Sequence, residues 1–181
     1  YRNYTSDELG RLVNDNIDVL DEEALLRAAT LAKKADDKIN IYNKAIEKYN
    51  SDRARFNLGA VYLAKGDADM AEKTFAKVNE KDADLDNANG VVALLKGDYK
   101  TAAALFKKAG TDAAKENQGL LDILTGDYSA AATAYAGKKG FNAALAQVLA
   151  NNPDKALDVL TCKCPKSNYL RAIIYARKGD A

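Results

Sequence analysis

The sequence contains no histidine and no tryptophan, and only two prolines and two cysteines occur among its 181 residues. Without histidine the chain lacks the commonest general base, which excludes Ser-His-Asp and Cys-His catalytic arrangements and most zinc sites. The phosphate-binding pattern GxxxxGK[ST] and the dinucleotide-binding pattern GxGxxG are also absent. We therefore predict that the chain is not an enzyme and that it uses no cofactor and no metal. The scarcity of proline favours a helical chain, because proline disrupts helix interiors.

Neither charge nor hydrophobic runs point to a nucleic acid or a membrane. The 27 Lys and Arg residues balance the 26 Asp and Glu residues to a net charge of +1, so no basic field would attract nucleic acid. No apolar run approaches the roughly 20 residues of a membrane-spanning helix, so we expect no direct membrane insertion. The 48% apolar content is enough for a packed core. Because the chain begins at Tyr1 and ends at Ala181, directly after a Gly-Asp pair, we expect it to be a piece of a longer protein.

A Gly-Asp pair recurs along the chain, each time after an apolar helical stretch. The pairs are Gly66-Asp67, Gly97-Asp98, Gly126-Asp127 and Gly179-Asp180. Small residues recur in register with the first three pairs, before the turn at Gly59, Gly90 and Gly119 and after it at Ala71, Ala102 and Ala131. An aromatic residue follows each of these alanines by four positions, at Phe75, Phe106 and Tyr135. This register predicts a helix-turn-helix unit repeated down the chain.

The small residues indicate how the two helices of one unit pack. Gly66 is expected to end the first helix in the left-handed conformation, and Asp67 to cap the second. Glycine within a helix costs about 1 kcal/mol relative to alanine. We expect packing to offset this cost, because Gly59 and Ala71 let the two helices approach closely while Phe75 fills the groove beside them.

The repeat register divides the chain into successive segments. We expect a leading helix within residues 1–20, capped at Ser6, and a degenerate repeat over residues 21–50 whose inner stripe includes Leu25, Ala28 and Leu31. Repeats follow at 51–83, 84–111, 112–137 and 138–165, and an incomplete one at 166–181. In the repeat at 138–165, Ala144 takes the small position and Asn151-Asn152-Pro153 supplies the turn.

The pattern Asn57-Leu58-Gly59-x-x-Tyr62, Gly66-Asp67, Ala71, Phe75 resembles that of the tetratricopeptide repeat family. The resemblance covers about residues 21–181 and is most specific at 51–83. These units are shorter than the family's roughly 34 residues, and the usual proline at the repeat end is missing. The resemblance implies an all-α fold, a right-handed superhelical stack of antiparallel helix pairs, and a protein–protein interaction scaffold.

The resemblance also implies a binding surface on the concave face, which the first helices of the repeats line in this family. The matching positions are Phe56, Ala60, Asn87, Val91, Glu116, Leu120, Phe141, Leu145, Tyr169 and Ile173. For the aliphatic positions, packing against neighbouring helices is the favoured interpretation, whereas for Phe56, Phe141 and Tyr169 packing and ligand binding stand equally. The family's clamp for acidic C-terminal peptides needs Lys and Asn where Phe56 and Ala60 stand, so that ligand is not predicted.

A second resemblance is to the repeat segment of multi-domain cell-envelope proteins of Gram-negative bacteria, carried by Phe141–Gln147 and by Tyr169–Arg177. It implies a periplasmic or outer-membrane-associated location, with a cytoplasmic one left open. Two functions follow as hypotheses. The first is a scaffold that binds a partner peptide or protein. The second is a structural spacer that docks onto other domains of its own parent chain and has no external ligand.

Cys162-Lys163-Cys164 is the one chemically reactive motif in the sequence. Two thiolates without further ligands leave a metal site incomplete. A disulfide between them would be strained by the short loop. We therefore favour two free thiols in a turn before Pro165, with a strained disulfide as the alternative in an oxidising compartment.

Overall fold

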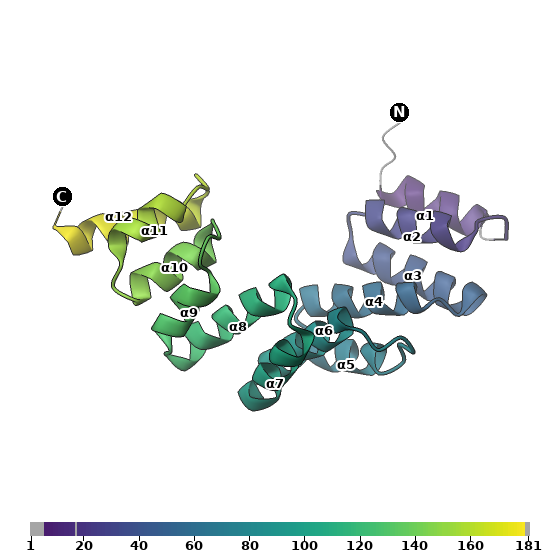
Figure 1. Cartoon of the computed structure of the whole chain (residues 1–181). Coiled ribbons are helices and arrows are strands. Elements are labelled where there is room, and N and C mark those ends of the chain that lie inside the picture. The colour runs from purple at the N-terminus through teal and green to yellow at the C-terminus, as the bar shows by residue number, and fades with distance from the viewer. Residues whose placement is uncertain (1–5, 17, 180–181) are drawn as a thin grey trace. The chain divides into compact units, whose positions relative to one another are not determined.

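The computed structural model describes residues 6–16 and 18–179 as helices joined by short turns (Figure 1). These described residues form twelve α-helices, most of which pack mainly against their neighbours in the sequence, which confirms the predicted all-α fold. The chain divides into two compact units, residues 1–98 and 99–181. The boundary falls within the expected repeat 84–111, after its Gly-Asp turn.

Unit 1 is a succession of helices in which each packs on the next. They are α1 (Ser6–Asp15), α2 (Glu22–Leu31), α3 (Ala35–Tyr49), α4 (Asp52–Ala64), α5 (Ala68–Phe75) and α6 (Ala83–Leu95). One apolar cluster lies among α1 to α4 and includes Leu25, Ile41 and Leu58. A second lies among α4, α5 and α6 and is built around Ala71 and Phe75. Tyr62 packs against both clusters, so α4 joins them into one core.

Unit 2 has the same kind of arrangement, with helices that follow one another along the chain. Its helices are α7 (Tyr99–Ala109), α8 (Asp112–Thr125), α9 (Tyr128–Ala134), α10 (Phe141–Leu149), α11 (Pro153–Val159) and α12 (Pro165–Lys178). The small residues of the repeat, Ala102, Ala131 and Ala144, are fully buried here. Leu170 and Ile174 pack α12 against Ala144 and Ala156 in a cluster of their own.

The Gly-Asp turns have the predicted geometry. Gly66 has φ of +76° and Gly126 has φ of +86°, which is the left-handed conformation that glycine adopts without strain. Gly97 and Gly179 also have positive φ. The Asp67 carboxylate accepts a hydrogen bond from the Met70 N–H group at 3.0 Å and so caps α5. The turns at Gly66-Asp67 and Gly126-Asp127 thereby end one helix and begin the next within a few residues.

The mid-helix glycines make room for aromatic rings. A Cβ atom built on Gly59 would lie 2.4 Å from the Phe75 ring, and one built on Gly119 would lie 2.8 Å from the Tyr135 ring. Each ring therefore occupies the space of the missing side chain, rather than a groove beside it. Gly90, the third glycine of the pattern, is buried as well.

The structure corrects some sequence-based boundaries. We expected Leu31 on the inner stripe, but its side chain is 72% exposed. The reason is that α2 ends at Leu31 and Ala32, which is 3% exposed, takes the buried position after Ala28 and Ala29. α12 begins at Pro165, one residue before the expected incomplete repeat at 166–181, because proline suits the first turn of a helix. The Ser6 side chain, expected to cap the leading helix, lies outside the described residues.

Candidate functional site

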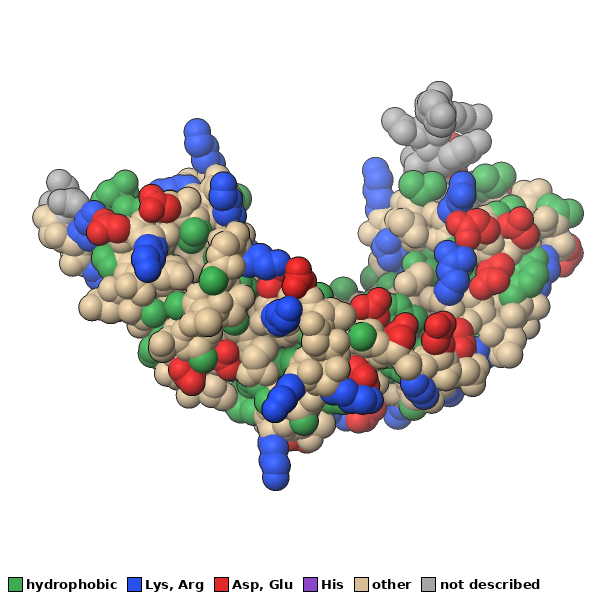
Figure 2. All heavy atoms as spheres, viewed as in Figure 1, with side chains coloured by type: hydrophobic (Ala, Val, Ile, Leu, Met, Phe, Trp, Pro, Cys, Tyr) green, Lys and Arg blue, Asp and Glu red, His purple; other side chains and the backbone are tan. Residues whose placement is uncertain are grey.

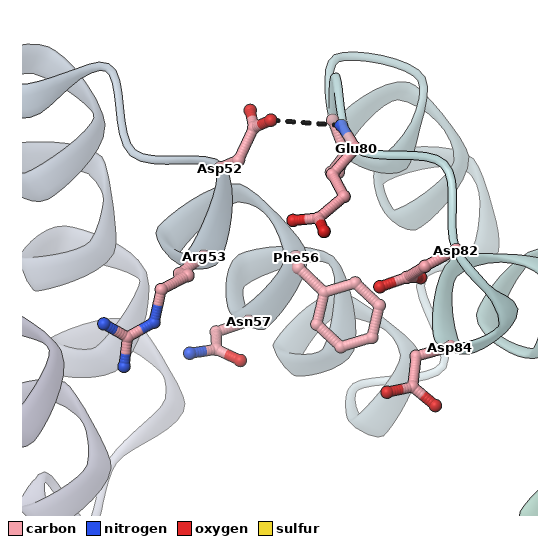
Figure 3. Close-up of a pocket in the computed structure, with 8 residues that line it drawn as sticks. Asp52, Arg53, Phe56, Asn57, Glu80, Asp82 and Asp84 are labelled. Carbon is pink, nitrogen blue, oxygen red and sulfur yellow. Dashed lines mark hydrogen bonds between the residues drawn. The ribbon is translucent and has the colours of Figure 1, made fainter.

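A cavity of about 300 Å³ opens beside Phe56, between the start of α4 and the α5–α6 loop (Figure 3). The residues that line it are Asp52, Arg53, Phe56, Asn57, Val78, Glu80, Asp82 and Asp84. Carboxylates outnumber the single lining cation, and Figure 2 shows acidic side chains gathered over α4 and the α5–α6 loop. The cavity thus combines an aromatic wall with a negative rim.

Backbone caps and one carboxylate fix the shape of this cavity. Ser51 caps α4 by accepting a hydrogen bond from the Ala54 N–H group at 3.0 Å. Asp52 accepts hydrogen bonds from the N–H groups of Asn79 at 2.9 Å and Glu80 at 3.2 Å, which ties the α5–α6 loop to α4. Burial raises the pKa of Asp52, but the Arg55 guanidinium and these N–H groups outweigh that effect, so the pKa lies below its ordinary value.

Phe56 has both of the roles that the sequence left open. Its side chain is half-buried, and its ring lies 5.7 Å from the Phe75 ring at a tilt of 51°. That contact belongs to the core of the repeat. The ring also lines the cavity, where Figure 3 shows it facing Asp82 and Asp84 across the open space.

A second cavity, of about 350 Å³, adjoins the first along α2 and α4. It is lined by Glu23, Leu26, Arg27, Thr30, Leu31, Arg53 and Asn57. Arg53 and Asn57 line both cavities, so the two adjoin. We call the surface over α2, α4 and α6 that holds both of them the α2/α4/α6 groove.

Arg53 lies at the junction of these two cavities. Arg53 Nη1 donates to Glu23 Oε2 at 3.0 Å and so links α4 to α2. Hydrogen bonds from Arg53 and then from Arg27 hold the pKa of Glu23 below its ordinary value. Both partners of the Arg53–Glu23 pair are largely exposed, so the pair orients the two side chains and adds little to stability.

In unit 2, the corresponding place at the start of a first helix is basic. A cavity of about 210 Å³ is lined by Glu116, Tyr135, Lys138, Lys139, Phe141, Asn142, Ala143 and Lys166. Lys166 Nζ lies 4.9 Å from the centre of the Phe141 ring, within the range of a cation–π interaction. Lys138 contacts Glu116 at 2.9 Å, and this hydrogen bond raises the pKa of Lys138.

An apolar cavity in unit 2 was not predicted from the sequence. It measures about 620 Å³, lies among α7, α8 and α9, and is lined by Ala103, Phe106, Lys107, Gly110, Ala114, Lys115, Gln118, Thr133 and Ala134. Small side chains at Ala103, Gly110 and Ala134 leave this space open. The alanines of α7 and α9 are the signal in the sequence that could have indicated this cavity. Their spacing does not show which face of each helix is left without a packing neighbour.

The structure distributes the ten candidate residues over both units. Phe56 lines the acidic cavity, and Glu116 and Phe141 line the basic one. Ala60 is exposed, and Tyr169 is 72% exposed. The others are half-buried: Asn87, Val91, Leu120, Leu145 and Ile173. Leu145 packs against the core around Ala144, which favours a packing role for it. Sequence reasoning did not select Arg53, Asn57 or Leu31, which line the groove.

Metal ligands, membrane-spanning helices and cysteines were also considered in the part of the chain that the structure describes. Within residues 6–16 and 18–179, no three His, Cys, Asp or Glu side chains come together as metal ligands. Among the described helices, none has the length and apolar character needed to cross a membrane. Cys162 and Cys164 are free thiols in the loop between α11 and α12.

The comparisons with known proteins identify the fold. No family model and no curated protein sequence matches the chain. Among solved structures, a tetratricopeptide repeat protein from Parabacteroides merdae is similar with a TM-score of 0.71 and 15% identity, over 93% of this chain and 76% of that one. YrrB, a TPR protein with an unusual peptide-binding site, is similar with a TM-score of 0.52 and 18% identity, over 98% of this chain and all of that one. This chain therefore has the tetratricopeptide repeat fold.

Proposed function

We propose that this chain is a protein-interaction scaffold that holds a segment of a partner protein in the α2/α4/α6 groove. The observation that carries the proposal is that two cavities share Arg53 and Asn57 and so adjoin one another over three first helices. The fold is one that generally mediates protein–protein interaction and is typically non-catalytic. Two adjoining cavities suit an extended segment better than a compact small molecule.

The side chains of the groove specify the chemistry of the segment. Leu31 is 72% exposed at one end, and the Phe56 ring lines the other. Both offer apolar contact surface, of the kind that supplies most of the binding energy in interfaces. Glu80 and Asp84 place carboxylates beside Phe56. The complementary partner segment therefore carries apolar side chains next to Lys or Arg.

The likeness to YrrB supports a peptide as the ligand class. That protein is described as having an unusual peptide-binding site, and its fold matches nearly the whole of this chain. Location in a bacterial cell envelope is a further proposal, supported by the sequence resemblance of Phe141–Gln147 and Tyr169–Arg177 to envelope proteins. The partner would then be another envelope protein or another domain of the same parent chain.

The test is selection of binding peptides from a random display library on the intact chain, followed by affinity measurement on two matched variants. Glu80→Lys/Asp84→Lys reverses two groove charges. Asp15→Lys/Glu47→Lys makes the same change in net charge at exposed positions of unit 1 outside both cavities. We expect selected peptides enriched in Lys or Arg beside apolar residues. They should lose at least about tenfold in affinity on the groove variant, equivalent to about 1.4 kcal/mol, and keep it on the control.

Two outcomes would overturn the assignment. Peptides that bind both variants equally would place the binding surface outside the groove. A library that yields no specific peptide on the folded chain would favour the structural spacer, whose groove is covered by the parent chain. In that case Leu31→Ser should alter docking of the parent's own domains, measured by crosslinking in the parent protein, without loss of any external partner.

A further inference from the structure

The loop between α11 and α12 holds two thiols close together at the start of a long helix. Cys162 is exposed and Cys164 is half-buried. The Cys164 N–H group donates a hydrogen bond to Cys162 Sγ at 3.0 Å, so the Cys162 side chain is folded toward Cys164. Cys164 Sγ in turn lies 3.2 Å from Ser167 Oγ. The two sulfur atoms are therefore presented side by side on one turn of chain.

Side chains of α12 donate hydrogen bonds to the backbone of this loop and so hold it in place. Arg171 Nη2 donates hydrogen bonds to the carbonyl oxygen atoms of Leu160 at 2.6 Å and Cys162 at 3.0 Å. Asn168 Nδ2 donates to the Lys163 carbonyl oxygen at 3.2 Å. Both donors belong to a 14-residue helix packed against α10 and α11, so the loop that carries the thiols is tied to that helix. A fixed pair of thiols loses little entropy when a bond forms between them.

The surroundings favour the thiolate form of Cys164. Hydrogen bonds from Cys162 and then from Ser167 lower the pKa of Cys164 to about 7. Cys164 is also the residue that precedes the first turn of α12, where the helix N-terminus stabilises negative charge. An attacking thiol reacts best when its pKa is close to the ambient pH.

We propose that Cys162 and Cys164 form a redox-active dithiol that exchanges with disulfides of small thiols or of other proteins. The Cys164 thiolate attacks one sulfur of the external disulfide, forms a mixed disulfide and releases the first external thiolate. Cys162, as its thiolate after losing a proton to solvent, then attacks the Cys164 sulfur and releases the second external thiolate. The two cysteines are oxidised to one internal disulfide, and the external disulfide is reduced to two thiols.

The spacing of the two cysteines makes this bond suited to exchange rather than to permanent crosslinking. A disulfide that closes over a single intervening residue, Lys163, is strained. Strained disulfides have more oxidising potentials and are the labile ones. An ordinary thiol should therefore be able to reduce the internal disulfide, so the exchange runs in both directions. This site is separate from the α2/α4/α6 groove and does not depend on the function proposed for it.

The test uses the intact chain, reduced and freed of reductant, with glutathione disulfide as the probe and intact-mass spectrometry after acid quenching. The wild type should lose two hydrogen atoms in mass and keep no glutathione. Cys162→Ser, which retains a hydroxyl donor beside Cys164, should stop at one stable glutathione adduct. At neutral pH the folded variant should form this adduct about fivefold faster than the same variant unfolded in urea, because the gain in thiolate outweighs the lower nucleophilicity.

Two matched variants separate the proposal from general thiol reactivity. Cys164→Ser leaves the exposed Cys162 and should react more slowly than Cys162→Ser. Ser167→Ala in the Cys162→Ser background should slow the adduct severalfold while the far-ultraviolet circular dichroism spectrum stays unchanged. A lasting glutathione adduct on the wild type without an internal disulfide would overturn the proposal. So would a folded Cys162→Ser chain that reacts no faster than the unfolded one.

Discussion

Replacing Gly59 with alanine should destabilise unit 1 even though alanine is the better helix former. Gly59 lies in the interior of α4, where the exchange by itself gains about 1 kcal/mol. Against that gain, the new Cβ atom would lie 2.4 Å from Phe75 Cε1 and 2.7 Å from two further ring atoms. The sign of the change in stability therefore depends on whether the ring can move.

The surroundings of Phe75 prevent an easy displacement. Its side chain is 1% exposed, and its ring lies against the Phe56 ring at 5.7 Å. Overpacking of a well-filled core costs about 1–3 kcal/mol, and a contact this short belongs at the upper end. Subtracting the propensity gain leaves a net loss of about 2 kcal/mol in the free energy of unfolding.

Urea unfolding followed by far-ultraviolet circular dichroism measures this loss, and two other mid-helix glycines provide matched controls. A Cβ atom on Gly10 meets nothing within 4 Å, so Gly10→Ala should not destabilise the chain. Gly119 has its nearest neighbours at 2.8 Å and 2.9 Å, so Gly119→Ala should cost less than Gly59→Ala.

A double-mutant cycle with Phe75→Leu tests the cause directly. Removing the ring should remove most of the penalty, so that Gly59→Ala becomes neutral or stabilising in that background. If Gly59→Ala is as stable as the wild type, the ring does not require the glycine and the packing argument is refuted. An equal penalty with and without the Phe75 ring would refute it as well.

Two further predictions concern the caps and contacts that shape the candidate surfaces. Tyr135→Phe should lower the stability of unit 2 by about 1 kcal/mol in thermal or urea unfolding, since the buried Tyr135 hydroxyl donates to the Glu116 carbonyl oxygen at 2.8 Å. Asp52→Asn should lower the urea midpoint at neutral pH, because the lowered pKa of Asp52 contributes stability that is present above its ordinary value of 3.8 and is lost as the pH falls below it. The difference between Asp52→Asn and the wild type should therefore shrink on acidification, and a difference that stays constant down to pH 3 would contradict the assigned contacts.

Much of the repeat could be predicted from the sequence because its signals are local. A glycine with positive φ ends α4 at Gly66 and α8 at Gly126, and the following aspartate caps the next helix in each case. These features depend on backbone conformation and on hydrogen bonds a few residues away. The pairing of Gly59 with Phe75 was also accessible, since a costly mid-helix glycine recurring in register needs a packing reason.

The groove could not be predicted in the same way. Leu31 seemed to belong to the inner stripe of its helix, but the helix ends there and turns the side chain outward. Asn57 belongs to the repeat motif and Arg53 to no motif, and neither pattern shows that both residues line two cavities, because that depends on how α2 and α4 pack. Family positions located Phe56, Glu116 and Phe141 at cavities but could not show that one cavity is acidic and the other basic.

By itself the sequence determined that this chain is helical and where the chain turns at Gly66-Asp67 and Gly126-Asp127, because period, small residues and caps are encoded within a few positions of one another. It also presented Cys162 and Cys164 as neighbours. Only the tertiary structure decided which side chains face each cavity, that Asp52 ties the α5–α6 loop to α4, and that Ser167 meets the Cys164 sulfur. Those arrangements depend on the packing of separate helices, and on where each helix begins and ends, which local patterns leave open.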